Sequence, residues 1–309
     1  MPTALLTKDD CRGILAPILT PLRDDESLDE GAFEALAHRL FDEGQPGLYL
    51  TGGTGEAYAL DDAVRAAVYV RAGRIVRERK KSEKLIAHVG GVPTRRAASL
   101  ARAAAEAGCH AVAAMPPHGG KYSYEELTAY YSALGAASPL PVFVYHIPEA
   151  TGYDFDRAKL SRWLELPNVM GMKFTSLDLY RMERLCALHP ETVIFHGNDQ
   201  VLMLGLSVGA TGAIGSTYNL LGGLAIKIMH AVWRNDLASA RRGQGALNHF
   251  IEGFHAHGGL RAFKALAAKR LGWKHAVSPA PGRWPAPEAV AEFEGRLEAA
   301  LAVAGELPE

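Results

Sequence analysis

The residue with the clearest potential for covalent chemistry is Lys173, near the end of an otherwise apolar segment, VMGMKFTS. Apolar surroundings remove hydration from an ammonium group and so favour the neutral amine, which can attack a ketone to form an imine. A lone lysine at a strand end more often extends its head group into solvent, so Lys173 alone is weak support for this chemistry.

A phenol in the preceding apolar segment, PVFVYHIP, strengthens that interpretation. If the two segments are neighbouring parallel strands, alternation puts Tyr145 on the same face as Phe143, and Lys173 on the same face as Gly171. Tyr145 could then exchange protons with the amine's adduct and with a substrate hydroxyl. A single tyrosine is more often a core residue with a satisfied hydroxyl, but the pair favours imine chemistry.

Other polar groups follow predicted strands. In TGGTGE, the glycines around Gly53 and Thr54 allow successive backbone N–H groups to converge on an anion such as the carboxylate of a 2-keto acid, although such a turn can serve backbone geometry alone. The segments HGNDQ and GAIGSTYN supply Asp199, Gln200, Ser216 and Asn219. These groups suit a polyhydroxylated substrate, while Asp199 could instead cap the helix that follows it.

The elements that must position these residues alternate between short β-branched segments and longer amphipathic ones. The predicted strands are Gly13 to Thr20, Gly47 to Thr51, Leu85 to Gly90, Ala111 to Met115, Pro141 to Ile147, Val169 to Thr175, Thr192 to His196 and Gly212 to Ser216. Predicted helices include Leu28 to Glu43, Ser99 to Ala107, Tyr124 to Gly135 and Asp178 to Leu188. Eight such units predict an α/β fold, a (β/α)₈ TIM barrel; a doubly wound sheet is the alternative, but no GxGxxG follows the first strand.

Further helical patterns follow the eighth unit and are interrupted by a proline-rich stretch, Ser278 to Pro287. We therefore predict a catalytic barrel over residues 1–230 and a C-terminal helical extension, 231–309, packed on the barrel.

Composition excludes several classes of protein. Lys and Arg number 33 against 34 for Asp and Glu, so the chain has no excess charge with which to bind nucleic acid or an anionic membrane, and no stretch is apolar enough to span a bilayer. The N-terminus lacks a secretory pattern, and Cys11, Cys109 and Cys186 are too few for a disulfide framework, which predicts a cytoplasmic protein. His255 and His257 lack nearby carboxylates, so no metal site is expected.

Five segments, in order, resemble the dihydrodipicolinate synthase and N-acetylneuraminate lyase family of class I aldolases: GGTGEAYAL, YHIPEATG, GMKFTSLDLYRME, HGNDQ and GATGAIGSTYN. The resemblance implies a (β/α)₈ barrel that forms a homotetramer. It also implies that Lys173 forms the Schiff base, that Tyr145 is the acid and base, and that the TGGTGE turn binds a carboxylate. The protonated imine is itself the electron sink, so no cofactor is expected.

Within the family, YHIP, LDLYRME and GSTYN are most similar to the N-acetylneuraminate lyases. That similarity implies that Thr175, Gly197, Asp199, Gln200 and Ser216 contact a sugar chain. Four positions depart from the family's patterns. Ala150 replaces the synthases' arginine, Gly53 replaces a Ser or Thr, His118 stands in a segment that often reaches into a neighbouring subunit, and Gln200 replaces a glutamate of the lyases.

We therefore expect a lyase that cleaves a keto-sugar acid reversibly to pyruvate and a sugar-derived aldehyde. The alternatives are a keto-sugar-acid dehydratase, a 4-hydroxy-tetrahydrodipicolinate synthase on the same scaffold, and a non-enzymatic barrel that binds keto acids. A missing guanidinium at Ala150 disfavours the synthase, because a substrate carboxylate would be left unpaired. Expected partners are small molecules, without nucleic acid or membrane.

Overall fold

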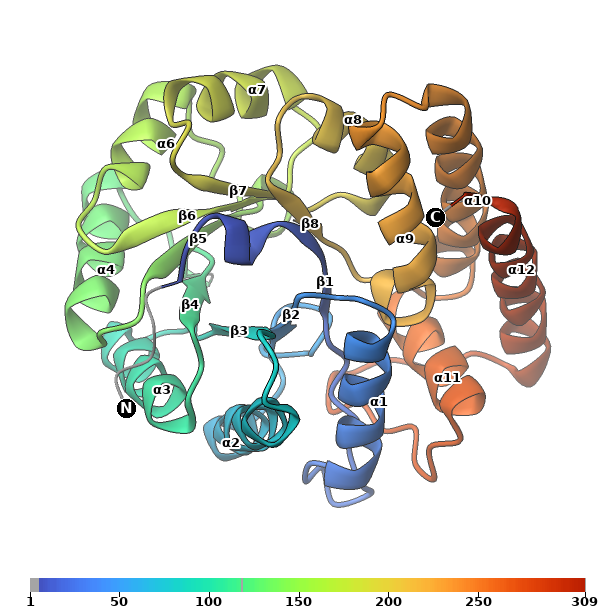
Figure 1. Cartoon of the computed structure of the whole chain (residues 1–309). Coiled ribbons are helices and arrows are strands. Elements are labelled where there is room, and N and C mark those ends of the chain that lie inside the picture. The colour runs from blue at the N-terminus through green and yellow to red at the C-terminus, as the bar shows by residue number, and fades with distance from the viewer. Residues whose placement is uncertain (1–5, 118, 309) are drawn as a thin grey trace.

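Eight parallel strands close into a barrel in the computed structural model, which describes residues 6–117 and 119–308 (Figure 1). The strands are β1 (Gly13–Pro17), β2 (Gly47–Leu50), β3 (Lys84–His88), β4 (Ala111–Ala114), β5 (Val142–His146), β6 (Val169–Phe174), β7 (Val193–His196) and β8 (Gly212–Ile214). Each strand pairs with the next, and β1 also pairs with β8. The predicted barrel is confirmed.

All eight predicted strands are present, and the largest difference is at the end of the first. The sequence pattern extends to Thr20, whereas β1 ends at Pro17. One further bond follows, from the Ile18 N–H to the Tyr49 carbonyl, at 3.1 Å. Ile18 and Leu19 follow the strand and are also buried, so the buried apolar segment is longer than the strand itself.

Helices surround the barrel: α1 (Glu30–Asp42), α2 (Asp62–Arg79), α3 (Thr94–Ala107), α4 (Tyr124–Ala137), α5 (Pro148–Thr151), α6 (Arg157–Leu164), α7 (Leu179–Leu188), α8 (Leu202–Ser207) and α9 (Tyr218–Trp233). Several begin at side chains that accept backbone N–H groups. Asp29 caps α1 through Ala32, and Ser123 and Glu126 form a reciprocal capping box at α4. A cap of this kind stabilises a helix by about 1 kcal/mol.

Side chains fill the barrel, so it is a packed core and not a channel. Leu15, Tyr49, Phe143, Phe195 and Ile214 belong to its interior cluster. A larger apolar cluster lies between the strands and the surrounding helices. Burying each large apolar side chain contributes about 1.5–3 kcal/mol, so these two layers fix the positions of the strand ends.

Three more helices, α10 (Leu237–Ala256), α11 (Leu260–Leu271) and α12 (Pro287–Glu306), follow α9. Figure 1 shows α10 and α12 beside α9 on the outside of the barrel, and the rings of Phe250 and Phe293 stack there with centres 4.6 Å apart. The predicted division after residue 230 falls in the last turn of α9; as a division into domains it stays a prediction. Within residues 6–117 and 119–308, no helix is long and apolar enough to cross a membrane.

Three histidines, two buried and one half-buried, predict a loss of stability in mild acid. Burial lowers the pKa values of His110, His146 and His196 from 6.5 to about 4. The unfolded chain therefore takes up these protons near pH 6.5, whereas the folded chain takes them up near pH 4. The free energy of unfolding should fall as the pH is lowered through this window, by about 1.4 kcal/mol per pH unit for each histidine at most.

Urea unfolding at pH 7, 6 and 5 measures how the free energy of unfolding changes with pH. The variant His110→Asn then distinguishes the contribution of one histidine from that of carboxylates that titrate in the same range. The His110 Nδ1 accepts the Leu85 N–H at 3.1 Å, a bond that an asparagine oxygen can also accept. The variant should show a shallower pH dependence than the wild-type chain. An equal slope in both proteins would contradict the assignment for His110.

Candidate active site

Lys173 and Tyr145 lie side by side inside the barrel. The register between β5 and β6 sets Tyr145 opposite Lys173, and the Lys173 Nζ lies 4.4 Å from the centre of the Tyr145 ring. Both side chains are buried, with 5% and 6% of their surface exposed, respectively. The adjacency that strand alternation predicts is present, and it places an amine and a phenol within reach of one substrate.

A second aromatic wall around the amine is Tyr49 on β2, which the sequence analysis missed. Its ring centre lies 5.0 Å from the Lys173 Nζ, and its ring meets that of Tyr145 nearly edge-on. Burial raises the pKa of the Tyr49 phenol well above its usual value, and its hydroxyl has no hydrogen-bond partner in the part of the chain that is described. The alternation that placed Tyr145 inside the barrel, applied to GLYL, would have identified Tyr49.

The glycine-rich turn after β2 lies against this cluster. A Cβ on Gly52 would come 2.6 Å from the Tyr49 ring, so only glycine fits, whereas a Cβ on Gly53 would meet nothing within 4 Å. The Thr54 Oγ1 lies 2.6 Å from the Ser216 Oγ. This hydrogen bond joins the turn after β2 to the segment after β8, across the point where the barrel closes.

These groups line one cavity of about 260 Å³. Its lining comprises Gly53, Thr54, Tyr145, Ile147, Lys173, Thr175, Gly197, Ile214, Ser216, Phe254 and Leu260. The residues predicted from the sequence to form the site are all among them except Asp199, Gln200 and Asn219. The cavity therefore brings together the amine, the phenol and the glycine-rich turn at the carboxyl ends of the strands, as expected for this fold.

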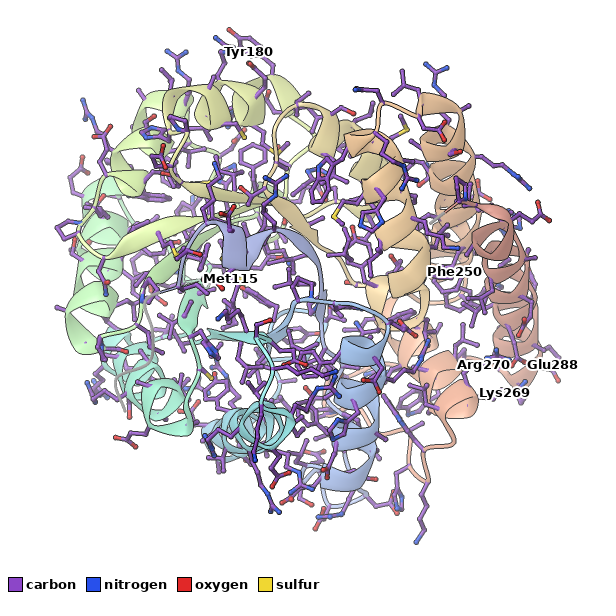
Figure 2. The ribbon with its side chains drawn as sticks, viewed as in Figure 1. Met115, Tyr180, Phe250, Lys269, Arg270 and Glu288 are labelled. Atoms are coloured by element: carbon purple, nitrogen blue, oxygen red, sulfur yellow. The ribbon has the colours of Figure 1, made fainter. Side chains whose placement is uncertain are left out.

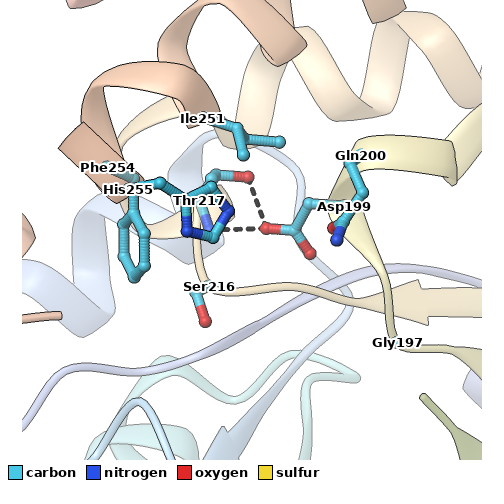
Figure 3. Close-up of a pocket in the computed structure, with 8 residues that line it drawn as sticks. All are labelled: Gly197, Asp199, Gln200, Ser216, Thr217, Ile251, Phe254 and His255. Carbon is cyan, nitrogen blue, oxygen red and sulfur yellow. Dashed lines mark hydrogen bonds between the residues drawn. The ribbon is translucent and has the colours of Figure 1, made fainter. Parts of the chain in front are cut away.

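Asp199 and Gln200 lie in an adjoining pocket of about 130 Å³ that shares Gly197, Ser216 and Phe254 with the cavity (Figure 3). Its full lining is Gly197, Asp199, Gln200, Ser216, Thr217, Ile251, Phe254 and His255. The two hollows are therefore neighbours, with Lys173 in one and the polar side chains of Asp199 and Gln200 in the other, an arrangement that suits an extended substrate.

Asp199 is buried and has a structural role as well. Its Oδ2 accepts the backbone N–H of Thr217 at 2.9 Å and the Thr217 hydroxyl at 2.7 Å, as Figure 3 shows. Thr217 immediately precedes α9, so Asp199 supports the start of α9; it does not cap the helix that follows it in the sequence, which was the alternative considered for it. Burial raises the pKa of the Asp199 carboxyl, and the two bonds from Thr217 oppose that rise.

Thr175 lines the inner cavity only. A Cβ on Gly197 would come within 1.9 Å of the Thr175 Oγ1, so the glycine makes room for this side chain. The Thr175 Oγ1 is buried and has no hydrogen-bond partner among the described residues. An unpaired buried hydroxyl facing a cavity is suited to bind a polar ligand atom.

The outer pocket has a wall from the C-terminal helices that the sequence analysis missed. Ile251, Phe254 and His255 project from one face of α10, and Leu260 begins α11. Their spacing of three and four residues was an available signal for a shared face. Nothing in the sequence, however, tells which helix face meets the mouth of the barrel, and His255 was considered only as a metal ligand.

The remaining predicted positions are placed as follows. Asn219 does not line the cavity; its side chain accepts the Leu19 N–H at 3.0 Å and donates to the Pro17 carbonyl, so it joins α9 to the end of β1. Ala150 is exposed on α5. His118 lies outside the described residues. Within the ranges described, no three His, Cys, Asp or Glu side chains are grouped as metal ligands.

Comparisons with known proteins identify a family, related sequences and similar structures. Residues 10–300 match the model of the dihydrodipicolinate synthetase family. N-acetylneuraminate lyase 2 of Escherichia coli O6:H1 is 34% identical over 82% of this chain and 83% of its own length. N-acetylneuraminate lyase of Escherichia coli strain SMS-3-5 is 36% identical over 82% of this chain and 85% of its own length. The structure of CdNal from Clostridium difficile in complex with mannosamine superposes with a TM-score of 0.87 and 26% sequence identity. The superposition covers 93% of this chain and 98% of CdNal.

Proposed function

The chain belongs to the dihydrodipicolinate synthetase family, and from this premise we propose that it is a Schiff-base-forming lyase that cleaves a keto-sugar acid reversibly to pyruvate and an aldehyde. Since one fold hosts many activities, the proposal depends on the site. The observation that carries it is the buried Lys173 amine between two phenol rings, at the inner end of a cavity with a glycine-rich turn on its wall.

In the proposed reaction, the Lys173 Nζ attacks the substrate's ketone carbon, and loss of water from the resulting carbinolamine gives a protonated imine. Tyr145 donates its proton to the hydroxide that leaves the carbinolamine, and the resulting phenolate then removes the proton from the hydroxyl on carbon 4. The bond between carbons 3 and 4 breaks, its electron pair passes to the iminium, and the aldehyde leaves an enamine on Lys173. Protonation of carbon 3 and hydrolysis of the imine release pyruvate and restore the amine.

The carboxylate of the keto acid would bind at the glycine-rich turn, where Gly53 and Thr54 line the cavity and would donate their backbone N–H groups to the anion. The hydrogen bond between Thr54 and Ser216 fixes one hydroxyl beside that position. The sugar chain would extend along Thr175, Gly197 and Ser216 toward Asp199 and Gln200, which line the outer pocket.

We further propose that the enzyme is a cytoplasmic homotetramer, as the family resemblance implies. Large exposed apolar side chains on and beside α7 support association: Tyr180, which Figure 2 shows on the outer rim, is 75% exposed, and Leu177 is 58% exposed. Contiguous exposed apolar residues commonly mark protein interfaces. Sedimentation equilibrium measures the subunit number directly, and a monomer at micromolar concentration would contradict this assembly.

The experiment that tests the activity combines intact-mass analysis with product analysis. Incubation with pyruvate and borohydride, followed by peptide mapping, should give a reduced adduct on Lys173. Incubation with N-acetylneuraminate and shorter keto-sugar acids should then release pyruvate and an aldehyde. A product that retains every carbon would identify a dehydratase, and a correctly folded protein without an adduct would disprove imine formation.

Gly53 offers a gain-of-function prediction. The family resemblance implies a Ser or Thr at this position, and a Cβ here would meet nothing within 4 Å, so Gly53→Ser should fit without rearrangement. The added hydroxyl can supply a hydrogen bond to the substrate carboxylate or pass a proton, which should raise kcat/KM up to about tenfold, or about 1.4 kcal/mol. Gly53→Ala is the matched control, because it adds the Cβ alone; equal rates for both variants would contradict a role for the hydroxyl.

A further inference from the structure

A buried ion pair joins the glycine-rich turn to a C-terminal helix. Lys264 of α11 donates to the carboxylate of Glu56, two residues after Thr54, and the two side chains are 1% and 3% exposed. Ser278, in the proline-rich stretch, donates to the other oxygen of the same carboxylate. Three segments that are far apart in the sequence therefore converge on Glu56.

The turn that carries Glu56 has a backbone that requires support. Thr51 and Glu56 have φ angles of +46° and +58°, in the left-handed region that residues with a Cβ rarely adopt. The Thr51 hydroxyl lies 3.0 Å from the His88 carbonyl and 3.1 Å from the Tyr69 hydroxyl, which hold the start of the turn. At its end, the Glu56 N–H donates to the Gly53 carbonyl, and the Glu56 side chain is held by Lys264.

Stability alone does not account for a pair of charges at this depth. Removing two charges from water costs free energy that their attraction barely returns, so apolar residues of similar volume commonly give equal or greater stability. Burial lowers the pKa of Lys264, and Glu56 opposes that change. A paired charge does, however, allow one geometry where an apolar contact would tolerate several.

The pair lies next to the walls of the cavity. On one side, Gly53 and Thr54 line it; on the other, Leu260 lines it one helical turn before Lys264 on α11. The ion pair therefore sets the position of α11 relative to the turn. Arg261 extends this connection, because its guanidinium donates to the Ala280 carbonyl and, at 3.3 Å, to the Ser278 hydroxyl.

We propose that Glu56 and Lys264 are positioning residues that hold the glycine-rich turn in the one conformation that binds the carboxylate of the keto acid. The inference rests on the proposed function, since that function supplies the ligand. Neither residue lines the cavity, so their effect reaches the substrate through the backbone of Gly53 and Thr54.

The test measures how much pyruvate half-saturates borohydride trapping on the full-length chain. Glu56→Gln/Lys264→Met removes both charges while keeping the side-chain volumes close to the originals. Lys269→Met is the matched control, because Lys269 lies on the same helix and pairs with Glu294 at 2.6 Å on the surface, where Figure 2 shows it.

We expect the double variant to need about tenfold more pyruvate for half-saturation, while its trapping rate at saturation stays within about threefold of the wild type. The control should match the wild type in both quantities. Half-saturation equal to the wild type, or a loss confined to the saturated rate, would overturn the positioning role.

Two further outcomes are distinguishable. If the wild-type chain forms no adduct at all, the proposed function fails and this inference fails with it. If circular dichroism shows that the double variant is unfolded, Glu56→Gln alone replaces it under the same criterion, because Gln keeps the side chain's shape and Lys264 can lose its proton. Unchanged half-saturation in that folded single variant would overturn the inference.

Discussion

Lys173→Ala should abolish turnover, with a loss in kcat of about 10⁴-fold or more, because none of the other described residues that line the cavity carries an amine to form the imine. The variant should also give no mass increase with pyruvate and borohydride. Its fold should persist, since the substitution removes a buried amine and leaves the aromatic walls from Tyr49 and Tyr145 in place.

Lys81→Ala provides the control for this variant. Lys81 is exposed and precedes β3, at the end of the barrel opposite to the cavity, so its loss should change neither turnover nor the adduct. An adduct that persists in Lys173→Ala would show that pyruvate reacts elsewhere, and the Schiff-base assignment would then be wrong.

Tyr145→Phe should lower kcat by about 10²–10⁴-fold, the range for removing a general acid or base, while changing the affinity for pyruvate much less. The phenylalanine ring would still cover the Lys173 amine, so the cavity keeps its shape. Single-turnover kinetics with a keto-sugar acid separates binding from bond cleavage, and the loss should fall on cleavage.

Tyr131→Phe is the matched control for this second variant. The Tyr131 hydroxyl donates to the Ala114 carbonyl at 3.2 Å, and the residue is fully buried on α4, away from the cavity. Losing that bond should lower stability by about 1 kcal/mol without affecting the rate of cleavage. Equal kinetic losses in both variants would mean that Tyr145 acts through packing and not through its hydroxyl.

The fold could be predicted from the sequence because the strands are short apolar segments and most of the long helices between them, though not α2, have an amphipathic pattern. The adjacency of Tyr145 and Lys173 followed from the same rule, since parity along neighbouring strands decides which side chains share a face. The ends of the strands were predicted less accurately. Burial continues from Pro17 to Thr20, although the strand ends at Pro17.

The rest of the site depends on contacts between segments that are distant in the sequence, which no local pattern encodes. The wall formed by Ile251, Phe254 and Leu260 depends on how α10 and α11 pack over the barrel mouth. The pair of Glu56 and Lys264 joins residues 208 positions apart. Tyr49 differs, because its strand was predicted and the alternation rule was applied to Tyr145 but not to it.

The contribution of α10, α11 and Ser278 to the site has a consequence for biosynthesis. A nascent chain that has emerged only to residue 230 already contains Lys173 and Tyr145. It still lacks Phe254 and Leu260, which line the cavity, and Ser278, which donates a hydrogen bond to the glycine-rich turn. Chains emerge from the ribosome from the N-terminus, so the nucleophile is translated long before its enclosure exists. Ribosome-bound intermediates should therefore be inert toward keto acids, and reactivity should arise only near the end of translation.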